Sequence, residues 1–417
     1  MDFTVILFVV MLAGVGFAIM RGYPVAFALA GTALLFGLLG IVVANVTGIP
    51  IGTLSFGTLS LFTERTFGIM TNEVLLAVPL FVAMGVMLEK SRVAEELLET
   101  MGEMFGSIRG GLGISITIVG ALLAASTGIV GATVVTMGLI SLPTMLKRGY
   151  DPALASGSIA AAGTLGQVIP PSIVLVLLGD VLSSSYQEAQ REMGIFSPDT
   201  VTVGDLFAGA FLPGLGLVVL FIIYQAAMAL LRPETSPAMP RDKDHQINAP
   251  FFGRLFKALV VPIALIAAVL GSILAGIATP TEAASLGAVG AILLGGLKLA
   301  PDKWKRITFS ALGLVFLLLQ AAFHWFPDGT SWVFLAAFAW GFVESLISAF
   351  KQGVLQQVMT STLKTTTMIF TILLAATMFS LVFRAYGGDD YIESVLTSLP
   401  GGVVGAMIVV MLVMFVL

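Results

Sequence analysis

Long apolar runs separated by short charged or Pro/Gly-rich breaks organise the whole chain. A helix needs about 20 apolar residues to cross a bilayer, so each run of that length predicts one transmembrane helix. The run 3–20 follows only Asp2 and lacks a basic start or a cleavage site, and is therefore interpreted as a retained span. The predicted single crossings are residues 3–20, 24–44, 73–89, 205–231, 258–277, 281–297, 307–325, 332–350 and 358–383.

The Lys and Arg residues predict the orientation of these spans. Cytoplasmic loops retain positive charge. With the N-terminus outside, only Arg65, Arg191 and Arg384 of the 20 basic residues fall on the non-cytoplasmic side. An outside N-terminus is therefore expected.

Residues 112–146 are too long for one crossing. Arg109 precedes the segment and Lys147 and Arg148 follow it, so the orientation requires both ends on the cytoplasmic side and predicts a helical hairpin. Its middle, 126–133, is rich in small and hydroxyl residues, as a re-entrant tip must be, because non-helical backbone at membrane depth survives only where it lines protein or water. Two full crossings packed through small residues are the alternative.

Residues 152–182 form the second long segment, which is predicted to be a broken helix. Pro170 and Pro171 near its centre disfavour a helical turn before them, and Pro171 has no N–H to donate. Two half-helices would expose dipole ends and free carbonyls able to coordinate a cation near the midplane. A proline kink without a ligand is the alternative, and the polar Thr164 and Gln167 argue against it.

A third polar cluster is Thr279-Pro280-Thr281-Glu282. It is typical of a cap for a helix that begins near residue 281, with Pro280 fixing the turn. Alternatively, Glu282 is an exposed first-turn acid favoured by the helix dipole.

Composition excludes several classes of function. Of the 417 residues, 58% are hydrophobic and 11% charged, and the mean hydropathy of +1.04 indicates that lipid is the main solvent. The net charge of -4, without a basic tract, argues against a nucleic-acid partner. The absence of Cys and the wide separation of His245 and His324 argue against thiol chemistry and a His-based metal site, and no cofactor is expected. No nucleotide motif is present, which leaves ion gradients as the energy source.

The chain contains a predicted inverted repeat. Residues 73–124 consist of an apolar span, an amphipathic stretch at 93–98, a Gly-Gly pair and a new apolar run, and residues 360–417 repeat this order from the opposite side. A second hairpin is expected after Gly402, so the sequence predicts that the chain is truncated at its C-terminus.

The predicted fold class is thus all-α: a polytopic transmembrane protein with inverted repeats, a re-entrant hairpin and a broken helix. The expected domains are N-terminal scaffold helices (1–72), a first repeat (73–204) containing the hairpin (112–146) and the broken helix (152–182), linking helices (205–298), an inserted Trp-rich helix pair (299–350) and an incomplete second repeat (351–417).

Several motifs together resemble the large membrane (permease) subunit of tripartite ATP-independent periplasmic (TRAP) transporters. The resemblance covers nearly the whole chain apart from residues 299 to about 345. The motifs are Val78-Pro79-Leu80-Phe81, Arg109-Gly110-Gly111-Leu112, Leu142-Pro143, Arg148-Gly149-Tyr150-Asp151-Pro152, Val168-Ile169-Pro170-Pro171-Ser172 and Ala278-Thr279-Pro280-Thr281-Glu282-Ala283-Ala284.

The resemblance implies a sodium-coupled, elevator-type permease of the bacterial inner membrane, with organic anions carrying a carboxylate as substrates. In that membrane the outside N-terminus expected from the basic residues is periplasmic. Its implied partners are a small four-helix membrane subunit and a periplasmic binding protein. By this resemblance, the hairpin tip and the broken helix together form one sodium site and half of the substrate site. The other half of the substrate site, supplied by the second repeat, would lie beyond Leu417. The implied residues are Ser126, Thr127, Gly128, Gly131 and Thr133 in the tip, Gly163, Thr164, Gly166, Gln167, Pro170, Pro171 and Ser172 in the broken helix, and Thr279, Pro280, Thr281 and Glu282 elsewhere.

The sequence departs from the family pattern at two places. Ile129 follows Gly128 where many members carry a serine, which weakens the case for hydroxyl coordination there. The insertion at 299–345 contains all four tryptophans and resembles the branch labelled for mannitol or chloroaromatic transport. An aromatic belt that contacts lipid or a subunit is favoured over a binding box for these tryptophans.

Three other functions compete with this prediction. A stand-alone sodium/organic-anion symporter would need no binding protein. An intramembrane enzyme would need a nucleophile with a base or a metal cluster, for which the sequence offers no set of residues. A purely structural subunit would have no use for a broken helix and polar tips.

Overall fold

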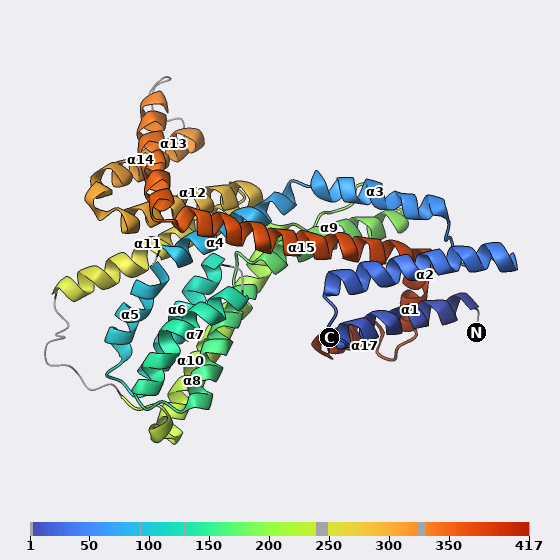
Figure 1. Cartoon of the computed structure of the whole chain (residues 1–417), viewed down its shortest axis with the longest axis horizontal. Coiled ribbons are helices and arrows are strands. Elements are labelled where there is room, and N and C mark those ends of the chain that lie inside the picture. The colour runs from blue at the N-terminus through green and yellow to red at the C-terminus, as the bar shows by residue number, and fades with distance from the viewer. Residues whose placement is uncertain (1–2, 92, 128–129, 239–248, 324–330, 417) are drawn as a thin grey trace. The chain divides into compact units, whose positions relative to one another are not determined.

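The computed structural model describes residues 3–91, 93–127, 130–238, 249–323 and 331–416, and every regular element in these ranges is a helix (Figure 1). The predicted all-α class is therefore confirmed. Within these ranges, five helices are long and apolar enough to cross a membrane by length and composition. They are α2 (Val25–Thr47), α10 (Val203–Leu231), α12 (Pro280–Leu299), α14 (Ser331–Lys351) and α15 (Val354–Ala385).

The chain divides into two compact units, residues 1–72 with 367–417, and residues 73–366. The first unit contains α1 (Phe3–Met20), α2, α3 (Phe56–Met70), the last part of α15, α16 (Gly388–Thr397) and α17 (Gly402–Val416). Tyr386 lies in its core, and its hydroxyl donates to the carbonyl of Phe36 at 2.7 Å. Burial raises the pKa of Tyr386 to about 12, so the phenol stays protonated in the folded protein.

The second unit contains the helices that carry the predicted hairpin and broken helix. In chain order these are η1 (Val74–Leu76), α4 (Ala77–Lys90), α5 (Val93–Phe105), α6 (Gly111–Thr127), α7 (Val130–Lys147), α8 (Pro152–Thr164), η2 (Leu165–Gln167), α9 (Ile173–Glu192), α10, η3 (Pro233–Thr235), α11 (Ala249–Leu274), α12, η4 (Pro301–Lys303), α13 (Trp304–Phe323), α14 and the first part of α15.

Small residues set the packing of α4 against α12. Gly287 and Gly295 of α12 lie eight residues apart on one face, and Cβ atoms added there would overlap the side chains of Met84 and Met87 of α4. In lipid the hydrophobic effect does not drive helices together, so van der Waals packing through small residues stabilises their association instead. The pair therefore forms a tightly packed element of the second unit.

Helix bounds differ from the predicted spans at several places. No helix was predicted at 56–70, whereas the structure has α3 there, capped by Ser55. Glu64 and Arg65 interrupt its apolar pattern, which is why a search for uncharged runs overlooks it. Likewise, α9 continues ten residues past the expected end at 182, because its polar last turns are helical although they are not apolar.

Candidate functional site

The hairpin consists of α6 and α7, which pack against each other on either side of residues 128–129. Gly128 lies outside the described residues, and so do the side chains of Ser126 and Thr127 at the end of α6. On α7, Gly131 is exposed and Thr133 is buried. Two contacting helical arms were predicted for 112–146. That the tip is re-entrant stays a prediction.

The helix break lies where the two prolines predict it. The first half, α8, ends at Thr164 and continues as the short η2, and the second half, α9, begins at Ile173. Ser172 is fully buried and caps α9, because its hydroxyl accepts from the backbone N–H of Leu175 at 3.4 Å. The same hydroxyl donates to the carbonyl of Gln167 at 2.8 Å. One serine thus joins both sides of the break.

Backbone groups in the break are only partly used by internal hydrogen bonds. The N–H groups of Val168 and Ile169 both donate to the carbonyl of Leu165, at 3.0 and 2.9 Å. The peptide bond between Pro170 and Pro171 is cis. A two-proline segment offers carbonyls without matching donors, which is the kind of backbone that can coordinate a cation.

The predicted residues of the break differ in exposure. Thr164 is exposed, and its hydroxyl donates to the carbonyl of Ala161 at 2.7 Å. Gln167 is partly buried and has a polar partner. The buried members are Gly163, Gly166, Pro170, Pro171 and Ser172.

Close packing through small residues holds the hairpin against the broken helix. Gly163 of α8 lies against Val134 of α7, and a Cβ added to Gly163 would overlap the Val134 side chain. Gly120 of α6 meets Ala162 of α8 in the same way, with the added Cβ 2.7 Å from the alanine Cβ. Figure 1 shows α6, α7 and α8 running side by side. The structure therefore packs the arms of the hairpin and the first half of the broken helix into one block.

An apolar cluster anchors the break to α10. Leu165 and Ile169 are buried against Leu217, Val218 and Phe221 of α10, together with Ala121 and Ile266.

A buried amide on α10 was not predicted. Gln225 is 3% exposed and its amide nitrogen donates to the hydroxyl of Ser158 on α8. Its Oε1 makes no hydrogen bond and faces Gly113 of α6, where an added Cβ would lie 2.5 Å from it. A single Gln in an apolar run carries no local signal of this contact, because its partner is 67 residues away.

A carboxylate on α4 also reaches the hairpin. Glu89 Oε1 accepts from the hydroxyl of Thr136 on α7 at 2.9 Å and pairs with Lys90 at the same distance. The glutamate side chain is 10% exposed. Glu89 is the last residue of the predicted span 73–89, and an acidic residue at the end of an apolar run is the signal in the sequence that points to it.

The cluster at 279–282 caps α12. The hydroxyl of Thr279 accepts from the N–H of Glu282, and the Glu282 carboxylate accepts from the N–H of Thr279, which makes a capping box with Pro280 at the first helical position. The hydroxyl of Thr281 donates to the carbonyl of Glu73 at 2.7 Å. Helix capping therefore explains the contacts of Thr279 and Glu282. The hydrogen bond of Thr281 connects α12 to the residue before η1.

The break brings the C-terminal end of α8 and the N-terminal end of α9 close together along the chain. Carbonyls near the end of α8 favour a cation, and the N-terminus of α9 favours an anion. Among the described residues, no group of three or more His, Asp or Glu side chains is placed to hold a metal ion through side chains. A cation bound at the break would therefore have backbone carbonyl and hydroxyl oxygens as its ligands.

Comparison with known proteins identifies what this architecture is similar to. Residues 5–417 match the family described as "Tripartite ATP-independent periplasmic transporter, DctM component". A C4-dicarboxylate TRAP transporter large permease of Rhodobacter capsulatus is 33% identical over 282 residues, 66% of this chain and 57% of the relative.

Two further relatives carry other names. An isethionate TRAP transporter permease of Oleidesulfovibrio alaskensis is 30% identical over 221 residues, 53% of this chain and 31% of the relative. An ectoine TRAP transporter large permease of Halomonas elongata is 29% identical over 223 residues, 53% of this chain and 46% of the relative. The chain thus spans about half the length of the curated relatives it matches.

Proposed function

Because the chain belongs to the DctM family of TRAP transporter permeases, we propose that it translocates an organic anion across a bacterial inner membrane, coupled to sodium. It acts as a carrier and not as an enzyme. The observation that supports this most directly is the interrupted helix at 165–172, packed against the hairpin and capped by the buried Ser172.

Coupling follows from the chemistry of the break. A sodium ion bound to carbonyls around Gln167 fixes the backbone on the α8 side. The Ser172 hydroxyl donates to the carbonyl of Gln167, so a backbone fixed by sodium also fixes the N-terminus of α9. A helix N-terminus that is already ordered binds a carboxylate more tightly, because binding no longer has to supply the free energy of ordering that terminus. In this proposal the residues that hold sodium and substrate are those predicted for the hairpin tip and the broken helix.

The moving part is the block of α6, α7 and α8 with the break. Glycine contacts at Gly120 and Gly163 make this block close-packed, which supports its movement as one body in an elevator mechanism past the outer helices. The orientation follows from the basic residues, with a periplasmic N-terminus.

The proposed partners are a periplasmic binding protein and a small membrane subunit. Relatives named for C4-dicarboxylate, isethionate and ectoine indicate that substrates vary within the family. A carboxylate-bearing solute is the class that the α9 N-terminus suits.

Uptake into proteoliposomes tests this proposal. The permease that contains this chain is reconstituted with its small subunit and binding protein, and a panel of radiolabelled organic acids is offered with and without an inward sodium gradient. Sodium-driven uptake that stops when the binding protein is omitted supports the proposal. Uptake that continues without the binding protein favours the alternative of a stand-alone symporter. Uptake at the same rate with and without the sodium gradient refutes the proposed coupling to sodium.

A further inference from the structure

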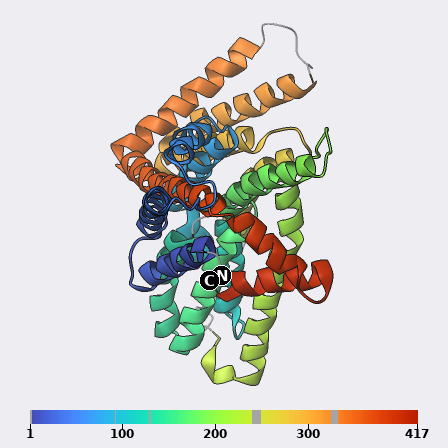
Figure 2. The ribbon, with the colours of Figure 1, turned by 90° about the vertical axis from the view of Figure 1, so that its right-hand side faces the viewer.

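A groove lies between α13 and α14, away from the hairpin and the break. The two helices run side by side, as Figure 2 also shows for the orange helices at the top, and they pack closely where Gly341 meets Ser310. The groove has a volume of 410 Å³ and is lined by Arg306, Phe309, Val333, Ala336, Ala337 and Trp340. One cation thus stands at an otherwise apolar surface.

We propose that this groove binds an anionic phospholipid, with the lipid phosphate at Arg306 and one acyl chain along α14. The inference is independent of sodium coupling and substrate. It requires only that the chain spans a membrane, as its family and apolar helices indicate.

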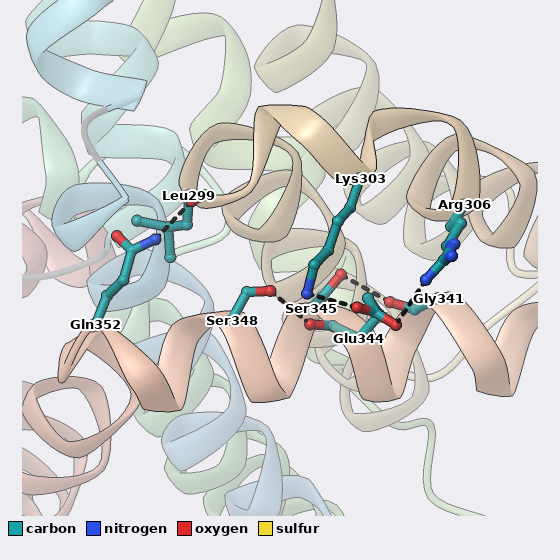
Figure 3. A network of polar contacts seen from close by, with 8 residues as sticks. All are labelled: Leu299, Lys303, Arg306, Gly341, Glu344, Ser345, Ser348 and Gln352. Atoms are coloured by element: carbon teal, nitrogen blue, oxygen red, sulfur yellow. Dashed lines mark hydrogen bonds and ion pairs between the residues drawn. The ribbon is translucent and has the colours of Figure 1, made fainter.

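Charge at the Arg306 end favours an acidic head group. Glu344 lies between two cations, with its carboxylate 2.5 Å from Lys303 and 3.7 Å from Arg306 (Figure 3). The longer distance exceeds that of a hydrogen bond, so Glu344 is satisfied mainly by Lys303. The Arg306 side chain is 59% exposed and keeps its N–H donors for a phosphate.

The wider charge balance at this end is also positive. Lys303, Lys305 and Arg306 carry three positive charges, against the two carboxylates of Asp302 and Glu344, which leaves an excess of one. Lys305 and Arg306 lie in the first turn of α13, Asp302 and Lys303 lie in η4 just before it, and Glu344 lies on α14. The start of α13 is on the side predicted to be cytoplasmic. Basic pockets between transmembrane helices on this side are typical sites for anionic lipid head groups.

The groove runs along α14. From Val333 to Trp340 it follows seven residues of this helix, about 10 Å at 1.5 Å per residue. Apart from Arg306 its lining residues are apolar, as contact with an acyl chain requires.

An exposed aromatic side chain lies beside the close contact of the two helices. Trp340 is 65% exposed. The next residue, Gly341, lies close to α13, because its added Cβ would lie 2.8 Å from the carbonyl of Arg306. Phe309 and Val333, both more than 60% exposed, provide apolar surface for the acyl chain.

Quenching of Trp340 by brominated lipids tests the proposal. The full chain, with the other three tryptophans replaced by phenylalanine, is placed in phosphatidylcholine vesicles that contain brominated phosphatidylglycerol or, separately, brominated phosphatidylcholine at the same mole fraction. We expect brominated phosphatidylglycerol to occupy the site with a preference of about fivefold, the effect of one basic contact. Arg306→Gln should abolish this preference, and Lys364→Gln, at an exposed basic residue on α15 outside the groove, should preserve it.

A second variant tests the acyl chain separately. Ala336 is exposed in the groove, so Ala336→Phe fills it without disturbing the packing of the two helices and should reduce quenching by both lipids. Equal quenching by the two lipids in the parent protein, or a preference unchanged by Arg306→Gln, would overturn the proposal. Absence of quenching by either lipid would also overturn it, because a protein segment would then cover Trp340.

Discussion

Gly163→Ala should destabilise the protein because of one contact between α8 and α7. The added Cβ would overlap the Val134 side chain and lie 3.2 Å from the Val134 Cα. Overpacking of this kind costs about 1 to 3 kcal/mol. Alanine also gains up to about 1 kcal/mol over glycine inside a helix, less near its end, which offsets part of that cost. The net loss of unfolding free energy should be about 1 kcal/mol, with a ceiling near 2 kcal/mol.

Gly157→Ala is the matched control. Gly157 lies in the same helix, α8, is exposed, and has nothing within 4 Å of its added Cβ. Only the helix propensity changes there, so this variant should be more stable than the parent by about 0.5 to 1 kcal/mol. The two glycine variants should therefore differ by about 2 kcal/mol with opposite signs.

Val134→Ala should relieve most of the effect. It removes the methyl groups that the new Cβ overlaps, while the Cα and Cβ of residue 134 stay 3.2 and 3.3 Å from it, so Gly163→Ala introduced in that background should cost much less than in the parent. The coupling energy between the two positions should be about 1 to 3 kcal/mol. Reversible unfolding by dodecyl sulfate in mixed micelles, followed by circular dichroism, measures all four members of the cycle. A coupling energy near zero, or equal stability of the two glycine variants, would refute the packing described for α7 and α8.

Three further substitutions test other contacts by the same unfolding assay. Ser172→Ala removes both hydrogen bonds of the buried cap and should cost about 1 to 3 kcal/mol, with sodium-driven uptake lost as well, whereas Ser172→Thr should retain most of both. Thr279→Ala should cost about 1 kcal/mol and Thr279→Ser almost nothing, and equal costs would contradict the capping box. Tyr386→Phe removes the hydrogen bond from the tyrosine hydroxyl to the carbonyl of Phe36 and should cost about 1 kcal/mol, and a neutral result would show that this bond adds nothing to stability.

Local chemistry explains why part of the architecture could be predicted from the sequence. Pro170 and Pro171 break a helix in any surroundings, so the interruption was visible in the residues themselves. The capping box at Thr279 and Glu282 likewise depends on residues three apart. Such features need no knowledge of what packs against them.

Contacts between distant segments could not be predicted in the same way. Gln225 is one amide within an apolar run, and its role depends on Ser158, which α8 brings to it. Glu89 was counted as the end of a span because its partner Thr136 lies 47 residues further on. The glycines of the hairpin were recognised as small residues, but which helix each one faces is decided only by the tertiary fold.

The glycine contacts between the hairpin and the broken helix also bear on electrical insulation. Where Gly120 and Gly163 let neighbouring helices touch, the backbones leave no room for side chains between them. Moving one charge across a membrane releases about 2.3 kcal/mol per 100 mV, so even a narrow wet path would pass ions freely. A carrier that depends on an ion gradient must not short-circuit it. If the block moves as proposed above, these close contacts exclude water from the seams between its helices.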